Sequence, residues 1–380
     1  MVSVTAILDR LIAFPSVSSE SNLDLIDWTR AYLASHGVDA RLTRDQAGRK
    51  ANIFASIGEG DGGIVLSGHT DVVPVIGQDW RTDPFVATHR DERIYGRGAC
   101  DMKGFIATAL SLVPDLVKSP VRRPVHFAFT YDEEIGCLGV RRLLDDLATL
   151  PIQPRGCVVG EPTNMRVVVG HKGAGMYAYT VTGRAAHSSL APFGVNAIEA
   201  SVRIIERFRA IAVRLVEREQ RHAGYDVPYT TVQVNRISGG SAGNIVADRC
   251  EFLIDIRSLP WTHQDELIAE VDAFIQSELL PEMRRVAPEA DVTMRQVGDV
   301  PGFAIEADAP LVQEALTHSG SMECDHVAFG SEAGLFQRSG IPAIICGPGS
   351  IEQAHKPDEF VELAQLEACE AMLRSLVGLG

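Results

Sequence analysis

Residues 64–71 read Ile-Val-Leu-Ser-Gly-His-Thr-Asp, a short apolar run followed closely by a histidine and an acid. The apolar run at 64–66 is typical of a buried β-strand. Side chains alternate along a strand, so His69 and Asp71 are predicted to project on the same side. A metal-ligating histidine usually donates its second N–H to a carboxylate, and we expect Asp71 to orient His69 in this way. Taken alone, the His-x-Asp pattern is weak evidence for a metal site.

Strands of the same kind alternate with helical patterns through the first half of the chain. Further strands are predicted at residues 125–129 and 157–159, and helices at residues 23–33, 105–116 and 140–150. Alternating strands and helices predict an α/β, three-layer domain with a mixed, mostly parallel sheet covered on both faces.

The pattern changes near Gly175 and changes back after Pro301. Between these points strands are predicted at 176–181, 230–234, 251–256 and 291–295, and helices at 196–215 and 264–280. This order is the βαββαβ, ferredoxin-like pattern. After it come a helix at 309–318, a strand at 343–345 and a helix at 363–377. We therefore predict a catalytic domain of residues 1–174 and 298–380, interrupted by an inserted domain at 175–297.

Composition excludes several classes of protein. Acidic residues outnumber basic ones 50 to 35 in 380 residues, and no basic stripe predicts a nucleic-acid partner. The seven cysteines form no Cys-x-x-Cys pair, which favours buried thiols in a reducing compartment. Neither an export signal nor an apolar run of about 18 residues is present, so we predict a cytoplasmic protein without a membrane span. A dinucleotide-dependent oxidoreductase is disfavoured because no Gly-x-Gly-x-x-Gly joins a strand to a helix.

Acidic residues follow several of the predicted elements. Asp101 lies in Gly-Arg-Gly-Ala-Cys-Asp-Met-Lys-Gly at the start of a helix, where it could equally be a helix cap. Residues 132–134, Asp-Glu-Glu, follow a strand, although three acids in a turn are usually a solvated surface. Glu161 follows the next strand, and His355 lies in the loop beyond the strand at 343–345. Open α/β sheets place ligands beyond the carboxyl ends of their strands, which favours a shared site.

Two imidazoles and three carboxylates can hold a pair of divalent ions if one carboxylate bridges them. The candidates are His69, Asp101, Glu134, Glu161 and His355. Glu133 is left over and is placed to act as a base on a water molecule, which predicts a hydrolase. The mixed nitrogen and oxygen ligands suit zinc, with cobalt or manganese as substitutes. Cys100, next to Asp101, is a possible soft ligand, but packing is the simpler interpretation.

The combined motifs resemble the co-catalytic metallopeptidase superfamily over essentially the full length. They are Ser-Gly-His-Thr-Asp, Gly-Arg-Gly-Ala-Cys-Asp-Met-Lys-Gly, Asp-Glu-Glu with Gly136, and Gly-Glu-Pro-Thr. Residues 170–173 and 329–333 resemble most closely the acetylornithine deacetylases of that superfamily. The resemblance implies that His69 and Glu161 hold one zinc, that Glu134 and His355 hold the other, and that Asp101 bridges them. It also implies that Glu133 is the catalytic base.

The resemblance also implies roles for residues of the inserted domain. His187 matches a histidine that reaches a partner subunit's active site and stabilises an oxyanion, although a lone histidine there is usually structural. Asn244 and Arg257 match positions that bind a substrate carboxylate, but an arginine after a strand is often a surface residue. A homodimer formed through the inserted domain is expected with these roles.

The expected reaction is hydrolysis of N-acetyl-L-ornithine to L-ornithine and acetate, a step of arginine biosynthesis. Glu332 is the first candidate to accept the δ-ammonium of the substrate. The alternative is that Glu332 has no binding role and is only the residue that starts a helix. An N-succinyl-diaminopimelate desuccinylase or a broader N-acyl-amino-acid amidohydrolase is the alternative within the superfamily. A non-enzymatic alternative is a catalytically silent relative that binds a metal or ligand. The presence of both Glu133 and all five candidate metal ligands disfavours it.

Overall fold

The computed structural model of the protein describes residues 3–119 and 122–379. The chain forms two compact units. The first contains residues 1–170, 303–327 and 331–380, and the second contains residues 171–302 and 328–330. The long segment of the second unit, residues 171–302, is thus inserted in sequence between two parts of the first. Among the described residues, no helix combines the length and apolar character needed to span a bilayer.

The first unit is built on a mixed sheet whose four central strands, β6, β3, β7 and β15, run parallel. Strands β1 and β2 continue it on one side and β8 on the other, all with antiparallel pairing. The strands are β1 (Ala40–Arg44), β2 (Ala51–Ile57), β3 (Ile64–His69), β6 (Val125–Thr130), β7 (Gly156–Val159), β8 (Val167–His171), β13 (Phe303–Ala304), β14 (Cys324–Val327) and β15 (Ala343–Ile345). The predicted mixed, mostly parallel sheet is confirmed.

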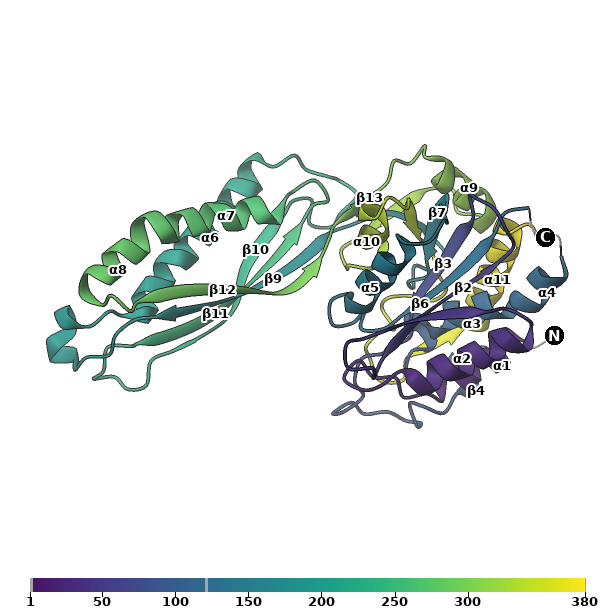
Figure 1. The fold of residues 1–380 in the computed structure, drawn as a ribbon, viewed down its shortest axis with the longest axis horizontal. Helices are drawn as coiled ribbons and strands as arrows, with labels where there is room; N and C mark the ends of the chain where they lie inside the picture. The colour runs from purple at the N-terminus through teal and green to yellow at the C-terminus, as the bar shows by residue number, and fades with distance from the viewer. Residues whose placement is uncertain (1–2, 120–121, 380) are drawn as a thin grey trace. The chain divides into compact units, whose positions relative to one another are not determined.

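Helices cover both faces of this sheet. Figure 1 shows α5 and α10 on one side of it and α3 and α11 on the other. The helices are α1 (Val4–Ile12), α2 (Leu23–Ser35), α3 (Gly104–Ser111), α4 (Val113–Lys118), α5 (Leu138–Leu147), α9 (Pro310–Ser319), α10 (Ala333–Arg338) and α11 (Leu363–Leu376). In α5 the buried residues recur at Val140, Leu143, Leu144 and Leu147, the spacing of one helix face.

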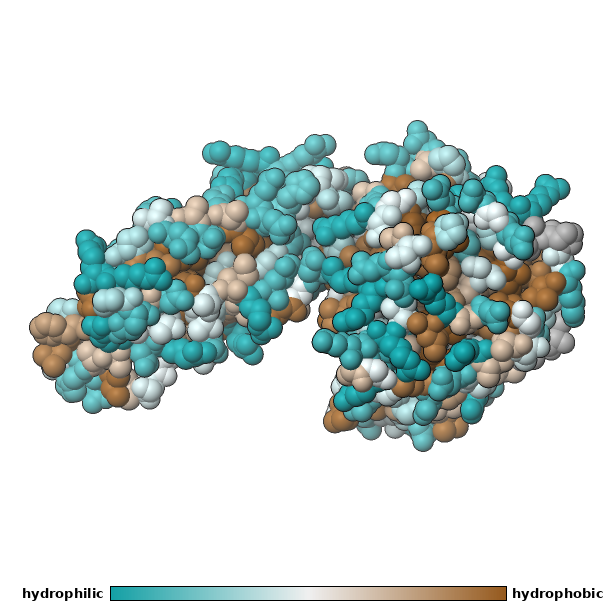
Figure 2. Space-filling model, viewed as in Figure 1, coloured by the Kyte–Doolittle hydropathy of each residue, from teal (hydrophilic) through white to brown (hydrophobic). Residues whose placement is uncertain are grey.

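Burial explains why the central strands read as continuous apolar runs. Every residue of β3 and β6 is buried, because helices pack on both faces of the sheet. The visible surface is largely hydrophilic with scattered apolar residues, as Figure 2 shows. The apolar residues of the strands and of the facing helices therefore form the core of this unit.

A second, smaller sheet in the first unit lies outside what the sequence patterns predicted. It joins β4 (Thr88–Arg90), β5 (Arg93–Tyr95) and β16 (Phe360–Glu362) in the order β16-β5-β4. Because β16 pairs with β5, the chain before β16 runs beside the chain after β5. The backbone N–H of Gly96 donates to the carbonyl of Glu359 at 2.9 Å. Two segments more than 250 residues apart in sequence are thereby held together.

The inserted unit has the predicted βαββαβ order. Its elements are β9 (Gly173–Thr182), a 3-10 turn at Ser188–Phe193, α6 (Ala197–Arg218), β10 (Thr231–Gly239), β11 (Arg249–Ser258), α7 (Gln264–Phe274), α8 (Leu280–Val286) and β12 (Asp291–Val300). The sheet order is β10-β11-β9-β12 with every pair antiparallel. A separate core of buried apolar residues lies within this unit, and β10 and β12 are the two edge strands.

Candidate metal and catalytic site

Asp101 lies between the two candidate histidines. Its Oδ1 lies 2.9 Å from Nε2 of His69, and its Oδ2 lies 3.3 Å from Nε2 of His355. Each carboxylate oxygen therefore faces a different imidazole. This is the geometry of a carboxylate that could be shared between two cations.

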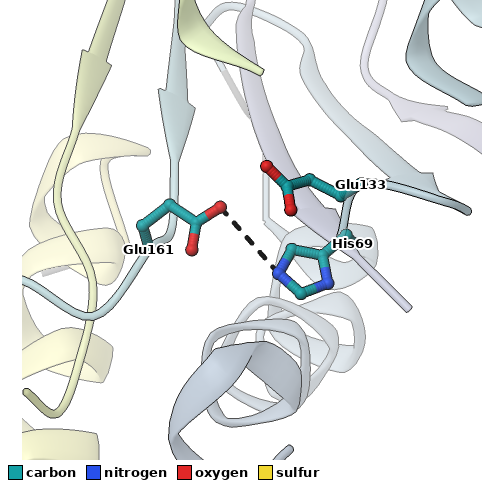
Figure 3. A group of neighbouring side chains, drawn as sticks. All are labelled: His69, Glu133 and Glu161. Atoms are coloured by element: carbon teal, nitrogen blue, oxygen red, sulfur yellow. Dashed lines mark ion pairs between the residues drawn. The ribbon is translucent and has the colours of Figure 1, made fainter. Parts of the chain in front are cut away.

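A further carboxylate accompanies each histidine. Glu161 Oε1 lies 3.9 Å from His69 Nε2, and Glu134 Oε2 lies 3.1 Å from His355 Nε2. Figure 3 shows Glu133 and Glu161 on different segments of chain, both beside the ring of His69. In each of two overlapping sets, candidate ligand atoms lie within 4.8 Å of one another: His69, Glu133 and Glu161, and His69, Asp101 and Glu134. The structure thus brings together all five predicted metal ligands and the predicted base.

The parallel strands explain why these residues meet. His69 is the last residue of β3, Glu134 follows β6, Glu161 follows β7, and His355 lies in the loop after β15. The carboxyl ends of parallel strands lie at one edge of the sheet, where open α/β folds bind their ligands. Asp101 arrives separately, from the loop between β5 and α3.

The carboxylates of this site suit a cation. Burial raises the pKa of Glu161 well above its usual range, and the neighbouring acids raise it further. Burial and Asp101 likewise raise the pKa of Glu134. Burial disfavours a charged His69, but Asp101 and Glu161 outweigh that effect and raise its pKa well above 6.5. Acids gathered out of water in this way need compensating positive charge, and carboxylate oxygens with imidazole nitrogens are the donors that zinc prefers. The residues present therefore fit a divalent metal.

Asp71 lies at this site, but its carboxylate does not make the hydrogen bond predicted for it. Nδ1 of His69 lies 2.9 Å from the backbone carbonyl of Asp71 and 3.7 Å from its carboxylate. The carboxylate instead accepts the Ser18 hydroxyl at 2.7 Å and the backbone N–H groups of Glu133 at 3.1 Å and Glu134 at 3.4 Å. Because β3 ends at His69, strand alternation no longer governs where Asp71 points.

Glu332 is as deeply buried as His69, the most buried of the candidate ligands. Its side chain is 1% exposed, and its two oxygens accept the hydroxyls of Thr130 at 2.6 Å and Ser67 at 3.3 Å. Burial raises the pKa of Glu332 to about 7. Its contacts join α10 to β3 and β6. Each oxygen keeps a further lone pair, so burial rather than these two hydroxyls limits the approach of a substrate ammonium.

The three candidates from the inserted unit lie on its surface segments. His187 is exposed, and its Nδ1 forms a hydrogen bond of 2.8 Å with the Ser189 hydroxyl. The backbone of Asn244 lies beside it, because its carbonyl accepts the N–H of Ser188 at 2.9 Å. Arg257, on β11, donates from Nε to Asp255 at 3.0 Å. The structure therefore brings His187 and Asn244 together within this unit.

Sequence reasoning missed several residues that support the site. Lys50 pairs with Asp132 at 2.5 Å and also donates to the Ser18 carbonyl, which anchors the turn of Glu133 and Glu134. Glu359 is buried beside the Asp101 loop. Neither residue lies in a patterned segment, so no signal in the sequence pointed to it. For Cys100, burial raises the pKa of the thiol well above its usual value, which supports the packing interpretation over a thiolate ligand.

Comparisons with known proteins agree with this architecture. The model of peptidase family M20/M25/M40 matches residues 65–378. The chain is 33% identical over 374 residues to the acetylornithine deacetylase of Aliivibrio salmonicida (strain LFI1238). The aligned region covers 97% of this chain and 96% of that protein.

Solved structures share the whole fold at lower identity. The M20 family metallo-carboxypeptidase Sso-CP2 from Sulfolobus solfataricus superposes with a TM-score of 0.76 at 19% identity, over 100% of this chain and 99% of that one. The YXEP protein of Bacillus subtilis, described as a dinuclear metal binding peptidase from M20 family, gives a TM-score of 0.66 at 16% identity, over 98% and 96%. The chain belongs to peptidase family M20/M25/M40 and is a hydrolase of its amidohydrolase and peptidase class.

Proposed function

We propose that this chain is a dinuclear metal-dependent amidohydrolase that removes the acyl group from an N-acylated amino acid, with N-acetyl-L-ornithine as the first-choice substrate. The observation that carries the proposal is the position of Asp101, whose two oxygens face the Nε2 atoms of His69 and His355. The name of the relative from Aliivibrio salmonicida supports the choice of substrate, and the description of the YXEP protein supports a pair of ions.

In this proposal His69 and Glu161 would hold one ion, Glu134 and His355 would hold the other, and Asp101 would serve both. The nitrogen and oxygen donors suit zinc, with cobalt or manganese as substitutes. Ions bound there would polarise the acyl carbonyl and lower the pKa of a water molecule.

Glu133 is the base in the proposed mechanism because it lies at the cluster but is not needed as a ligand. Its carboxylate takes a proton from the attacking water and delivers it to the departing amine nitrogen as the C–N bond breaks. The products are a carboxylic acid and a free amine. The main chain of Glu133 is anchored by Asp71, and its Oε1 accepts the Cys137 thiol at 3.3 Å. This support keeps the base in one orientation through both proton transfers.

The inserted unit supplies the remaining groups in this proposal. His187 stabilises the oxyanion in the partner subunit's site, and Asn244 and Arg257 bind the substrate carboxylate. A homodimer formed through the inserted unit is part of the same proposal. Its support is that β10 is an edge strand exposed over most of its second half, and a free edge invites pairing with a second copy.

A broader N-acyl-amino-acid amidohydrolase is the second candidate function, and the enclosure of Glu332 favours it. Glu332 is buried and already accepts the hydroxyls of Thr130 and Ser67, which makes it a poor acceptor for a δ-ammonium that arrives from solvent. An enzyme without that acceptor would discriminate weakly between ornithine and other amino acids. Discrimination is strong when a wrong substrate leaves a buried polar group of the binding site without its hydrogen-bond partner.

A panel assay tests both candidates. Purified protein with its metals quantified is offered N-acetyl-L-ornithine, N-acetyl derivatives of leucine, methionine and glutamate, N-succinyl-diaminopimelate, and dipeptides. The first proposal expects kcat/KM for N-acetyl-L-ornithine to exceed the others by at least about tenfold. Similar values across the N-acetyl series would support the second candidate. Absence of metal-dependent amide hydrolysis from every substrate would overturn both.

A further inference from the structure

Glu359 carries a buried carboxylate that accepts four hydrogen bonds from one loop. Its Oε1 accepts the backbone N–H groups of Cys100 at 2.9 Å and Asp101 at 3.0 Å. Its Oε2 accepts the backbone N–H of Gly98 at 3.0 Å and Nη1 of Arg97 at 2.7 Å. Three of the four donors are main-chain groups of the loop that carries Asp101, so Glu359 fixes the backbone from which that ligand projects.

Arg97 extends this contact toward the loop that carries the second histidine. Its Nη2 donates to Oε1 of Gln78, and its Nη1 lies 3.3 Å from the carbonyl of Lys356. Nε2 of Gln78 in turn donates to the carbonyl of His355 at 2.8 Å. A continuous chain of hydrogen bonds therefore runs from Glu359 to His355. We call its three side chains the Glu359 network: Gln78, Arg97 and Glu359.

The network is electrically balanced. Arg97 and Glu359 are each 1% exposed and pair with each other, so together they bring no net charge to the acidic site. An ion pair buried this completely adds little stability relative to apolar packing. It does, however, restrict strongly the orientation of the groups that it joins. Its many main-chain contacts indicate that it serves to hold the two loops in place.

His355 needs such support more than His69 does. His69 ends a buried strand, and its side chain is 1% exposed. His355 lies in a loop, its side chain is 53% exposed, and its φ of 64° lies in the left-handed region. A residue other than glycine is strained there and persists only where its surroundings fix it. The contacts at the carbonyls of His355 and Lys356 supply that restraint.

We infer that the Glu359 network is a positioning unit that holds His355 against Asp101. The inference rests on the proposed dinuclear function and deepens it, because it makes the two ions unequal. The ion held by Glu134 and His355 depends on the network. The ion held by His69 and Glu161 depends mainly on the central sheet, whose strands β3 and β7 carry its ligands.

Replacing Gln78 with Glu is the most selective test. The variant Gln78→Glu keeps an oxygen acceptor for Arg97 but removes the N–H donor to the His355 carbonyl. Glu359→Gln is the stronger variant, because one of its acceptor oxygens becomes an NH2 group facing N–H donors. The control is Glu362→Gln. This substitution removes an exposed ion pair of 2.9 Å between Glu362 on β16 and Arg93 on β5, the two strands next to the network.

Metal-free full-length proteins are titrated with Co²⁺, and binding is followed by calorimetry and by visible absorption. The parent chain and Glu362→Gln are expected to bind two equivalents with the same affinities. In Gln78→Glu the first equivalent should bind within about twofold of the parent, and the second about 10- to 100-fold more weakly. In Glu359→Gln, which also loosens the backbone of Asp101, both equivalents should bind more weakly, and the second should weaken more. Raising the Co²⁺ concentration should then restore kcat in Gln78→Glu.

The outcomes separate the two proposals. If Gln78→Glu binds both equivalents as the parent does, or weakens both equally, the positioning inference is overturned while the dinuclear function stands. If the parent chain itself binds fewer than two equivalents, the dinuclear function fails. Should Glu359→Gln not fold, Gln78→Glu decides alone, because Gln78 is partly exposed and outside the core.

Discussion

Asp71 accepts the backbone N–H of Glu133 on its carboxylate at 3.1 Å. The same carboxylate accepts the N–H of Glu134 and the hydroxyl of Ser18, so it anchors the turn that carries the proposed base and one proposed ligand. His69 is oriented by the backbone carbonyl of Asp71 instead. One residue thus positions two elements of the site with two different groups.

Replacing Asp71 with Asn should lower turnover by about 10- to 100-fold, because support residues around metal sites have effects of that size. The new amide NH2 would face the N–H of Glu133 or of Glu134 and loosen the turn. The backbone carbonyl that holds His69 is unchanged, so metal bound there should remain. Steady-state kinetics with metal analysis measures both. An Asp61→Asn control, in an exposed loop, should behave as the parent chain; equal activity in Asp71→Asn would show that the turn needs no such anchor.

Replacing Glu133 with Gln should leave two ions per chain and reduce kcat by about a hundredfold or more, the usual contribution of a positioned base. The isosteric amide cannot accept the proton from water. Metal content is measured by elemental analysis and kcat on the best substrate of the panel. A Glu133→Gln protein that keeps most of its activity would exclude Glu133 as the base. One that lost an ion would make Glu133 a ligand, as its place beside His69 and Glu161 permits.

The central strands and the candidate ligands at their ends could be predicted because each signal is local. Strands β3, β6 and β7 are short continuous apolar runs, and the parallel fold itself dictates that the residues after them meet. Four of the five candidate ligands follow parallel strands in this way, namely His69, Glu134, Glu161 and His355, whereas Asp101 is predicted from the glycine-rich segment at the start of a helix. The hydrogen bond of His69 goes to the backbone carbonyl of Asp71, and the predicted carboxylate partner keeps only an ion pair at 3.7 Å, because β3 ends at His69 and strand alternation does not extend to Asp71.

The support of the site could not be predicted because it depends on pairing between distant segments. Glu359 lies in Lys-Pro-Asp-Glu-Phe, which looks like a solvated turn. It becomes buried only when β16 pairs with β5, and its contacts reach residues about 260 positions earlier in the chain. Lys50 is a lone lysine whose partner Asp132 lies 82 residues away. Such contacts carry no periodicity that a single sequence can show.

Replacing Glu332 with Gln tests whether this residue binds the substrate ammonium. Since the carboxylate is enclosed by Thr130 and Ser67, we expect KM for N-acetyl-L-ornithine to stay within about twofold of the parent value, because no ground-state contact is lost. Stability should fall by about 1–3 kcal/mol, as one buried hydroxyl loses its acceptor. A KM that rises at least tenfold for N-acetyl-L-ornithine but not for N-acetyl-leucine would instead establish a direct contact.

Mixing two inactive variants tests whether His187 acts in the partner subunit's site. His187→Ala and Glu133→Gln dimers are combined and allowed to exchange subunits. In a mixed dimer, the His187→Ala subunit keeps its own Glu133 and receives His187 from its partner, so one of two sites is complete. Random exchange makes half of the dimers mixed, and about a quarter of the parent activity should return.

The same mixture gives a clear contrary result. If His187 serves the site of its own subunit, every subunit in the mixture lacks one of the two residues, and no activity returns. Size-exclusion chromatography with light scattering accompanies the assay. A parent chain that is monomeric and fully active would rule out action across an interface.

His126 should make the stability of the protein depend on pH below neutrality. It lies 2% exposed on β6, with Nδ1 2.8 Å from the Ser56 hydroxyl and its ring stacked on Phe54. Burial lowers the pKa of His126 from 6.5 to about 4. Between these values the unfolded chain binds a proton that the folded chain does not. The contribution of His126 to the free energy of unfolding is therefore fully present above about pH 6.5 and is lost as the pH drops toward 4.

Replacing His126 with Gln removes this titration while keeping a partner for Ser56. Between pH 7 and pH 5 the parent chain should lose about 2 kcal/mol more unfolding free energy than His126→Gln, since 1.5 pH units below 6.5 correspond to about that amount. Urea titrations at the two pH values measure the difference, and acids shared by both proteins cancel. His263→Gln, at an exposed histidine, should keep the parent's pH dependence. If His126→Gln keeps it too, His126 takes up its proton in the folded state, and its burial in β6 does not hold the ring neutral.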